Sequence, residues 1–322
     1  MQKVFFLLLF VIPFICAAQR DSVVTLDKDE LKHKQNASSE EMKVFYSQKL
    51  INANTVEVLR KGIMEFRVSH GFGDIGGDFG GSKRFFGLDE AADIRIGMQL
   101  GLSNKLNVIL ARDKGAGAVR QNYEVGLKYQ FLRQEENDPS HPISLTVFAN
   151  SVVSSMTANT LANQENSFNK FSDRTSEVVQ LMVARRFGNI SLQLSPTFVT
   201  RGLVKPGDDK SLFAIGAGVR IPLTKKFIFI ADYFHTFHSA TAKAMWADTT
   251  SAGGGGVKFY DALGVGFEIL TQGHIFHVNF TNASELLENR FIAHNVTDWG
   301  QGQFRWAFTI SRNFTVFRDK KR

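Results

Sequence analysis

Glycines and histidines occur in this chain at spacings that form ligand-binding sites in other proteins. The run GFGDIGGDFGG (71–81) has the G-x-G-x-x-G spacing of dinucleotide-binding loops. No helical pattern follows it, so a nucleotide loop is excluded. The pairs His235/His238 and His274/His277 have H-x-x-H spacing, but residues i and i+3 of a strand point to opposite faces. Only a loop placement of the first pair with a third ligand would bind metal, and we predict no metal and no cofactor.

A nucleophile and a base also stand side by side in the sequence. Ser69 and His70 have the residue types of a hydrolytic dyad. Adjacent residues of a strand face opposite ways, so these two cannot act together. A hydrolase would need a distant serine paired with a histidine such as His235. We therefore predict that the protein is not an enzyme, and a membrane-embedded hydrolase stays the third alternative.

The elements that carry these residues are runs of alternating hydrophobicity. About twelve such runs occur, most of them between Lys61 and Ile310, and each is about long enough to cross a membrane as a tilted strand. In KGIMEFRVSH (61–70) and FRWAFTI (304–310), every second residue is large and apolar, and the residues between are small or charged. This period of two predicts strands with one apolar face.

The gaps between the runs alternate in length. A transmembrane β-barrel with both termini in the periplasm has short periplasmic turns and long outer loops, whereas a soluble sandwich has connections of similar length at both ends. We therefore predict an all-β fold, an antiparallel transmembrane barrel of about twelve strands. The mostly long gaps are 73–91, 113–120, 155–174, 202–211, 236–257 and 282–303, and the mostly tight ones are 103–104, 133–142, 188–189, 222–226 and 271–274.

Charged residues recur on the small face of the strands, and their signs nearly balance. A charge that faces lipid at mid-bilayer costs about 2–4 kcal/mol, so we predict that these residues line the lumen. Oppositely charged side chains would either pair across the lumen and close it or line a narrow watery pore. The predicted lumen-lining residues are Glu65, Arg67, Asp93, Arg95, Glu124, Lys128, Arg220, Asp232, Glu268 and Arg305.

The two ends of the chain differ from the middle. Residues 1–18 have a basic residue, an apolar run and small residues before the cut, which is typical of a secretory signal peptide. Cys16 follows Ile15, where lipoprotein processing prefers a small side chain, so a lipid anchor is disfavoured. The predicted domains are the signal peptide 1–18, a periplasmic lead-in or plug segment 19–60, the barrel 61–317 and a charged tail 318–322.

Composition limits the partners. The formal net charge is +7, but the basic residues are scattered and form no basic helix, so nucleic acid is not a predicted partner. Phe accounts for 30 of 322 residues, which suits lipid-facing surfaces and interfacial girdles. We predict export by the signal peptide to the outer membrane. The expected partners are membrane lipid, the outer-membrane assembly machinery and a small polar solute.

Several stretches in order along the chain resemble one protein family. The family is domain-of-unknown-function family five-seven-seven-seven, whose members are β-barrel proteins of Gram-negative envelopes. The resemblance spans nearly all of 44–317. It implies a barrel and implies no activity. The stretches that carry it are 50–73, 85–108, 123–134, 271–284 and 304–314.

The sequence therefore predicts a narrow outer-membrane channel or facilitator for a small polar solute. The alternative is a closed structural or interaction barrel with no transport. Residues 44–60 show no strand period, and they either plug the barrel or pack beneath it.

Three positions test the strand assignment. Pro196 falls inside a predicted strand, so we expect a bulge or an irregular ladder there. Val265→Arg on the lipid face is expected to be severe. Gly266→Ser on the opposite face is expected to be mild.

Overall fold

The computed structural model describes residues 42–77, 79–136, 138–249 and 255–317. The predicted signal peptide (1–18), most of the lead-in and the charged tail (318–322) lie outside these residues.

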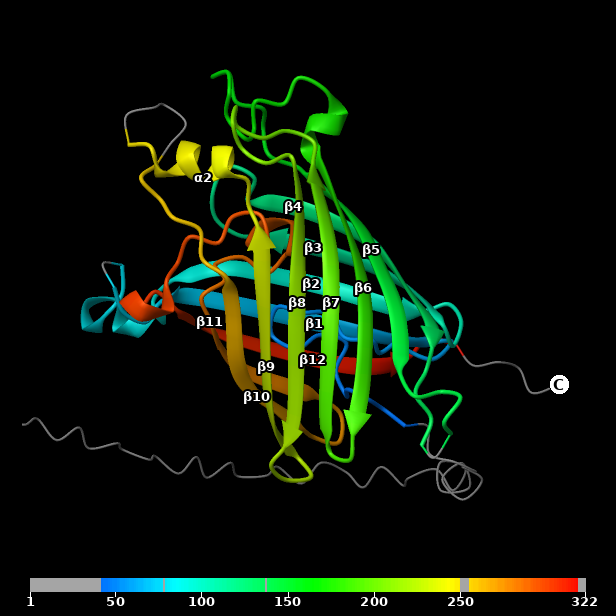
Figure 1. Ribbon diagram of the computed structural model, residues 1–322. Coiled ribbons are helices and arrows are strands. Elements are labelled where there is room, and N and C mark those ends of the chain that lie inside the picture. Colours follow the sequence, from blue (N-terminus) through cyan, green and yellow to red (C-terminus); the bar gives the residue numbers. More distant parts are fainter. Residues whose placement is uncertain (1–41, 78, 137, 250–254, 318–322) are drawn as a thin grey trace, which may run out of the picture. The chain divides into compact units, whose positions relative to one another are not determined.

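Twelve antiparallel strands in the described part of the chain close into one barrel (Figure 1). Each strand pairs with its neighbours along the chain, and the first strand pairs with the last. This confirms the predicted fold class. The strands are β1 (Ile63–Asp74), β2 (Ala91–Gly101), β3 (Leu106–Lys114), β4 (Gln121–Leu132), β5 (Ser144–Ser154), β6 (Thr175–Phe187), β7 (Ile190–Arg201), β8 (Ser211–Pro222), β9 (Phe227–Phe237), β10 (Ala262–Leu270), β11 (Ile275–Thr281) and β12 (Arg305–Thr315).

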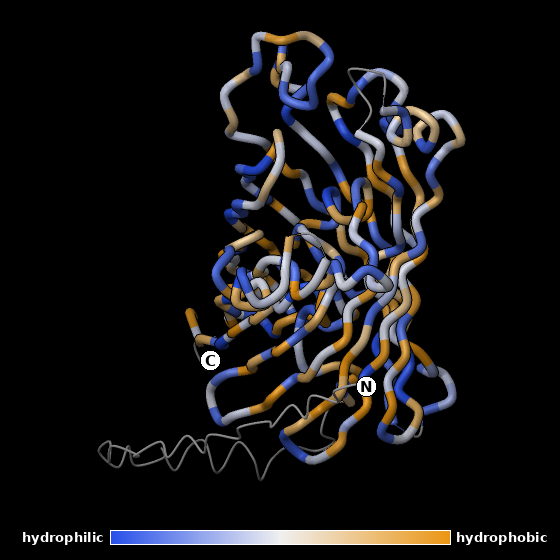
Figure 2. Tube along the Cα trace, turned by 90° about the vertical axis from the view of Figure 1, so that its left-hand side faces the viewer, coloured by the Kyte–Doolittle hydropathy of each residue, from blue (hydrophilic) through white to orange (hydrophobic). Residues whose placement is uncertain are grey.

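Alternation along each strand separates an outer face from an inner face. In β4, Tyr123, Val125 and Leu127 are exposed, whereas Glu124 and Lys128 at alternate positions are buried. Apolar and polar residues alternate in the same way along the other strands (Figure 2). An exposed band of large apolar side chains around the ring is the surface that a lipid environment requires.

Long and short connections leave opposite ends of the barrel, as the gap lengths predicted. We call these the long-loop end and the short-turn end. At the long-loop end, the longest connections are 75–90, 155–174, 238–261 and 282–304, and at the short-turn end β6 and β7 are joined by 188–189 alone.

The long connections carry the helices. They are η1 (Ser82–Gly87), η2 (Phe171–Arg174), α2 (Ala240–Ala247), α3 (Glu288–Phe291) and η3 (Trp299–Gln301). The hydroxyl of Ser239 caps α2 by accepting a hydrogen bond from the N–H of Ala242 at 3.0 Å. Among the residues that the structure describes, no helix combines the length and the apolar character needed to span a membrane.

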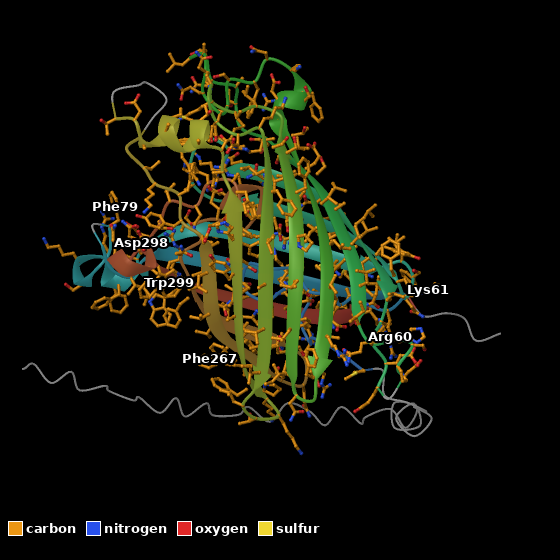
Figure 3. All side chains as sticks on the ribbon, viewed as in Figure 1. Arg60, Lys61, Phe79, Phe267, Asp298 and Trp299 are labelled. Carbon is orange, nitrogen blue, oxygen red and sulfur yellow. The ribbon has the colours of Figure 1, made fainter. Side chains whose placement is uncertain are left out.

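Stacked aromatic pairs lie at both ends of the barrel and include Phe267 and Trp299, which Figure 3 labels. Phe267 stacks on Phe227, with ring centroids 4.6 Å apart, beside the short turns. Trp299 stacks on Phe304 at 4.3 Å at the long-loop end. Such rings suit the two membrane interfaces, where an apolar body meets polar headgroups.

Pro196 lies within β7 at an interrupted ladder. On one side of it Gln180 pairs with Thr197, and on the other Val183 pairs with Leu194 in the same register, while the residues between are skipped. Because proline has no backbone N–H to donate, an interruption without a register shift accommodates it. This confirms the predicted irregular ladder position.

Gly266 has less room than the sequence suggested. A Cβ built there would overlap the Oδ1 of Asn279 and lie 2.7 Å from the carbonyl oxygen of Val278. That carbonyl belongs to the β10–β11 ladder and cannot yield without disturbing it. The expectation that Gly266→Ser is mild is therefore wrong, because β11 approaches this glycine too closely.

We expect Val265→Arg to destabilise the barrel by about 2–4 kcal/mol, since it places a charge on the outer face of β10. Unfolding of the refolded protein in lipid vesicles measures the loss, and heat-dependent migration in SDS reports the folded fraction. Val265→Leu at the same position is the matched control. Equal stability of the two variants would contradict the outward placement of this side chain.

Candidate functional site in the barrel interior

Residues 42–60 form no strand of the barrel and lie inside it. We call them the inserted segment. Val44, Leu50 and Val56 are each 2% exposed or less. They belong to a core that also contains the inner-face residues Phe148 of β5 and Phe234 of β9. The interior is thus filled by the chain that precedes the first strand.

The inserted segment enters and leaves at the short-turn end. The carbonyl of Val44 accepts a hydrogen bond from a serine hydroxyl at the start of β7. The N–H of Leu59 donates to Asn107 Oδ1 in β3 at 2.7 Å. Between these points, Lys49 and Asn54 form an antiparallel bridge. The segment therefore makes a narrow loop whose tip, residues 50–53, lies in the barrel.

The carboxylate of Asp232 in β9 holds this tip. It accepts hydrogen bonds from the backbone N–H groups of Ile51 (2.9 Å), Asn52 (2.7 Å) and Ala53 (2.9 Å), and from the side-chain amide of Asn52 (2.9 Å). Buried backbone donors need a partner, and an ionised acceptor gives stronger bonds than a neutral one. One predicted lumen residue thus supplies the acceptor for three consecutive amides.

Two inward glycines make room for the tip. A Cβ at Gly218 would lie 2.6 Å from Leu50 Cδ1, and one at Gly264 would lie 2.7 Å from Ile51 Cγ2. Separations under 3.0 Å do not occur for real Cβ atoms. The small residues of the inner face are therefore the seat of the inserted segment.

Glu57 closes the base of the loop. Its carboxylate accepts the backbone N–H groups of Val44 (2.9 Å) and Phe45 (3.0 Å). Burial raises the pKa of Glu57 above its usual range, and these donors counter part of that rise.

All ten predicted lumen-lining residues are buried, with 7% exposure or less. Their ion pairs, however, join side chains on the same strand, on adjacent strands or on two strands with one other strand between them. The pairs are Arg67–Glu65 within β1 (3.0 Å), Arg95–Glu124 between β2 and β4 (2.6 Å), Arg220–Glu268 between β8 and β10 (3.5 Å) and Arg305–Asp74 between β12 and β1. Of the two alternatives that the sequence left open, pairing across the lumen is therefore not what these ion pairs do.

Two further predicted residues contact the inserted segment. Lys128 Nζ donates to the carbonyl and to the side-chain Oε1 of Gln48, both at 3.3 Å. Arg67 Nη2 donates to Ser47 Oγ at 2.6 Å. We call the charged inner face of β1 to β4 the charged wall. Two of its side chains thus bind the inserted segment through hydrogen bonds.

The opposite side of the interior carries a buried apolar cluster among polar residues such as Gln180 and Asp232, and the sequence analysis did not predict this cluster. Met182, Ile228, Ile230 and Phe234 are buried on the inner faces of β6 and β9. A signal was present in the run FIFI (227–230), which is apolar on both faces of its strand.

A second insertion comes from the long-loop end. The β11–β12 connection folds inward, and Leu287 and Phe291 of its α3 region are buried. Glu288 accepts hydrogen bonds from Lys49 Nζ (2.6 Å) and Asn54 Nδ2 (2.9 Å). The two insertions therefore meet at one buried carboxylate.

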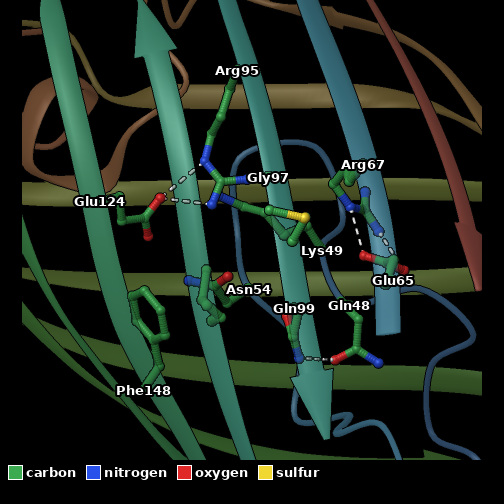
Figure 4. A pocket seen from close by; sticks show the side chains of 12 residues that line it. Gln48, Lys49, Asn54, Glu65, Arg67, Arg95, Gly97, Gln99, Glu124 and Phe148 are labelled. Carbon is green, nitrogen blue, oxygen red and sulfur yellow. Dashed lines mark hydrogen bonds and ion pairs between the residues drawn. The ribbon is translucent and has the colours of Figure 1, made fainter. Parts of the chain in front are cut away.

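Little space remains where the charged wall meets the inserted segment (Figure 4). The cavity there measures about 20 Å³, which holds about one water molecule. Its lining includes Lys49, Asn54 and the pairs Arg67–Glu65 and Arg95–Glu124. A cavity of this size blocks the passage of solutes where the charged wall meets the inserted segment.

Neither H-x-x-H pair converges on a common point. His235 Nδ1 contacts Asp261 Oδ2 at 2.9 Å on the outside, whereas His238 lies in the loop beyond β9. His277 is buried beside Glu268 at 3.4 Å, and His274 lies in the short turn before β11.

One exposed turn does gather ligand-type atoms. Glu135, Asp138 and His141 lie close together in the β4–β5 connection, where exposed groups of this kind are common without an ion. Ser140 Oγ also contacts His141 Nδ1 at 3.1 Å, and Asp138 Oδ2 contacts the same nitrogen at 2.7 Å. A proton relay needs the two partners on opposite ring nitrogens, so this cluster is not a catalytic triad.

The closed ring, its apolar outer face and its filled interior define a membrane-spanning β-barrel. The family described as a membrane bound beta barrel domain (DUF5777) matches residues 45–314, and the chain belongs to this family. No curated protein matches the sequence.

Solved structures resemble this barrel at low identity. The NanC porin is 9% identical with a TM-score of 0.45, covering 79% of this chain and 100% of the porin. An outer membrane channel from Pseudomonas putida F1 is 11% identical with a TM-score of 0.46, covering 80% and 98%. The outer membrane phospholipase A from Escherichia coli is 10% identical with a TM-score of 0.40, covering 84% and 100%. No functional inference follows from these likenesses.

The long loops contain a buried histidine whose charge state should affect their packing. His238 stacks on Phe259 with ring centroids 3.9 Å apart. Burial lowers the pKa of His238 to about 4, against the opposing effect of Asp209 and Asp208. In an unpacked loop the same group takes up its proton near 6.5.

We therefore expect the loop packing to be fully stable above about pH 6.5 and to weaken as the pH falls toward 4, because the unpacked state binds more protons there. Hydrogen exchange of the 238–261 connection, corrected for intrinsic rates, measures this. His238→Phe keeps the stack and removes the titration, so its pH effect should shrink. The same pH profile in both proteins would contradict the assignment.

Proposed function

We propose that the protein is an outer-membrane channel for a small polar solute, closed by the inserted segment and opened when that segment leaves the lumen. The observation that carries this proposal is the charged inner wall of β1 to β4, which includes Arg67, Arg95, Glu124 and Lys128. Burying such charges costs free energy, and apolar residues of similar volume would seal a barrel at least as well. A charged wall is useful where water and polar solutes enter.

The contacts of the inserted segment with this wall suit a removable gate. Lys128 and Arg67 bind it through hydrogen bonds from charged groups, which water replaces at a net cost of about 1.5–3 kcal/mol each. The larger cost of opening lies in the apolar contacts of Phe45 and Leu50 and in the four hydrogen bonds that Asp232 accepts from the tip. We also propose that the barrel is exported by its signal peptide, inserted into the outer membrane by the assembly machinery and surrounded by lipid there.

A second candidate is a closed structural or interaction barrel without transport. The buried apolar cluster favours it, because Phe148, Met182 and Phe234 form one continuous core with Phe45 and Leu50 of the inserted segment. A core of this kind stabilises a permanently filled interior. Under either candidate the protein is proposed not to be an enzyme.

We expect Gly264→Leu to raise the conductance of the barrel in planar lipid bilayers, because its side chain occupies the space of Ile51 and unseats the tip. Gly218→Leu, which displaces Leu50, should act in the same way. Wild type should show low or rare conductance. Val265→Leu, on the outer face, is the matched control and should behave as wild type.

Two results would contradict the proposed channel function. A large steady conductance in wild type would show that the inserted segment is not a gate. Zero conductance in both glycine variants and in a chain lacking 42–59, each folded by its migration in SDS, would favour the closed barrel.

A further inference from the structure

Two carboxylates lie together at the long-loop end of the inner wall. Asp93 of β2 and Asp113 of β3 are each 1% exposed. Arg95 is directly opposite Asp113 in the β2–β3 ladder, so Asp93, two residues before Arg95, shares the inner face and lies diagonally across from Asp113. Gly115 packs directly against Asp93, since a Cβ there would lie 3.1–3.2 Å from the carboxyl atoms. The two acids thus share one small enclosed site.

The neighbouring cations are already paired with other acids. Arg95 bonds Glu124 at 2.6 Å, and Arg290 bonds Glu285 at 2.8 Å. Within the described ranges, none of the ion pairs includes Asp93 or Asp113. Arg95 is opposite Asp113 in the β2–β3 ladder but is bound to Glu124, so the two adjacent buried carboxylates repel each other unless a further positive charge lies between them.

Unused oxygen atoms lie around the same site. Asp93 Oδ1, Asp113 Oδ2 and Asn122 Oδ1 are buried without a hydrogen-bond partner in the described structure. Asn122 is 1% exposed and directly opposite Asp113 in the β3–β4 ladder. Its Nδ2 donates to Asp113 Oδ1 at 3.4 Å, so the amide group of Asn122 lies against the carboxylate pair. A neutral side chain thus adds a third free oxygen to two acidic ones.

We propose that Asp93, Asp113 and Asn122 bind a divalent cation, with Ca²⁺ as the ion that fits best. Hard cations take carboxylate and amide oxygens, and this set contains no nitrogen or sulfur ligand. The charge of the ion would match the two unpaired carboxylates. A proton shared between them is the competing way to remove the repulsion.

The site is also linked to the folded-in loop. The backbone N–H of Leu286 donates to Asp93 Oδ2 at 2.7 Å, which ties the β11–β12 connection to the same carboxylate. An ion that fixes Asp93 would therefore also stabilise the second insertion, which meets the inserted segment at Glu288. This inference does not depend on whether the barrel opens.

Calorimetric titration of Ca²⁺ into the refolded full-length chain tests the proposal. The detergent solution is first freed of metal ions with a chelator, and the chelator is then removed. Wild type should bind a single ion, and Asp113→Asn, which keeps the shape, should bind at least about tenfold more weakly. Asp93→Asn should do the same. Asp138→Asn, which alters the exposed cluster in the β4–β5 connection, is the matched control and should bind as wild type.

Hydrogen exchange gives a second readout. Ca²⁺ should slow exchange in 282–298 of wild type and leave Asp113→Asn unchanged. The proposal is overturned if wild type binds no Ca²⁺ at millimolar concentration, which would leave the shared proton. It is equally overturned if Asp113→Asn binds as tightly as wild type, or if Asp138→Asn abolishes binding.

Discussion

The hydrogen bonds between Asp232 and the three amides of residues 51–53 are the interaction on which the interior depends. A chain that enters a barrel without joining its ladder leaves backbone donors unpaired, and each one costs free energy when it is buried. A single ionised carboxylate satisfies three of them at the tip. The seat formed by Gly218 and Gly264 and the apolar contacts of Leu50 are useful only because the tip can be held there.

Two kinds of contact hold the inserted segment in the interior. The apolar cluster on β5, β6 and β9 stabilises it through buried area. Polar side chains on both sides of the barrel, Arg67 and Lys128 of the charged wall and Asp232 of β9, hold it through hydrogen bonds. For the segment to leave, the second insertion, bound through Glu288, would have to release Lys49 and Asn54.

The strands and the faces of their charged residues could be predicted, because a period of two is a local property of sequences such as Met64–Ser69 in β1. The partners of those charges could not. Asp232 binds residues 180 positions away, and the inserted segment has no periodicity that marks its path. Its side-chain and backbone bonds depend on the shape of the closed barrel. The inward glycines and the apolar run at 227–230 were the available signals, and neither specifies which segment fills the space.

The most direct test of the central claim is a cross-link between the inserted segment and the wall. A Cβ at Gly264 would lie 2.9 Å from Ile51 Cβ, and a disulfide needs about 3.5–4.5 Å, so a small shift suffices. Oxidation of Ile51→Cys/Gly264→Cys in membranes should give an intramolecular disulfide, whereas Ile51→Cys/Val265→Cys, with the second cysteine outside, should not. If both thiols of the first variant stay unpaired in the folded barrel, so that an alkylating reagent labels them, the result would contradict the account.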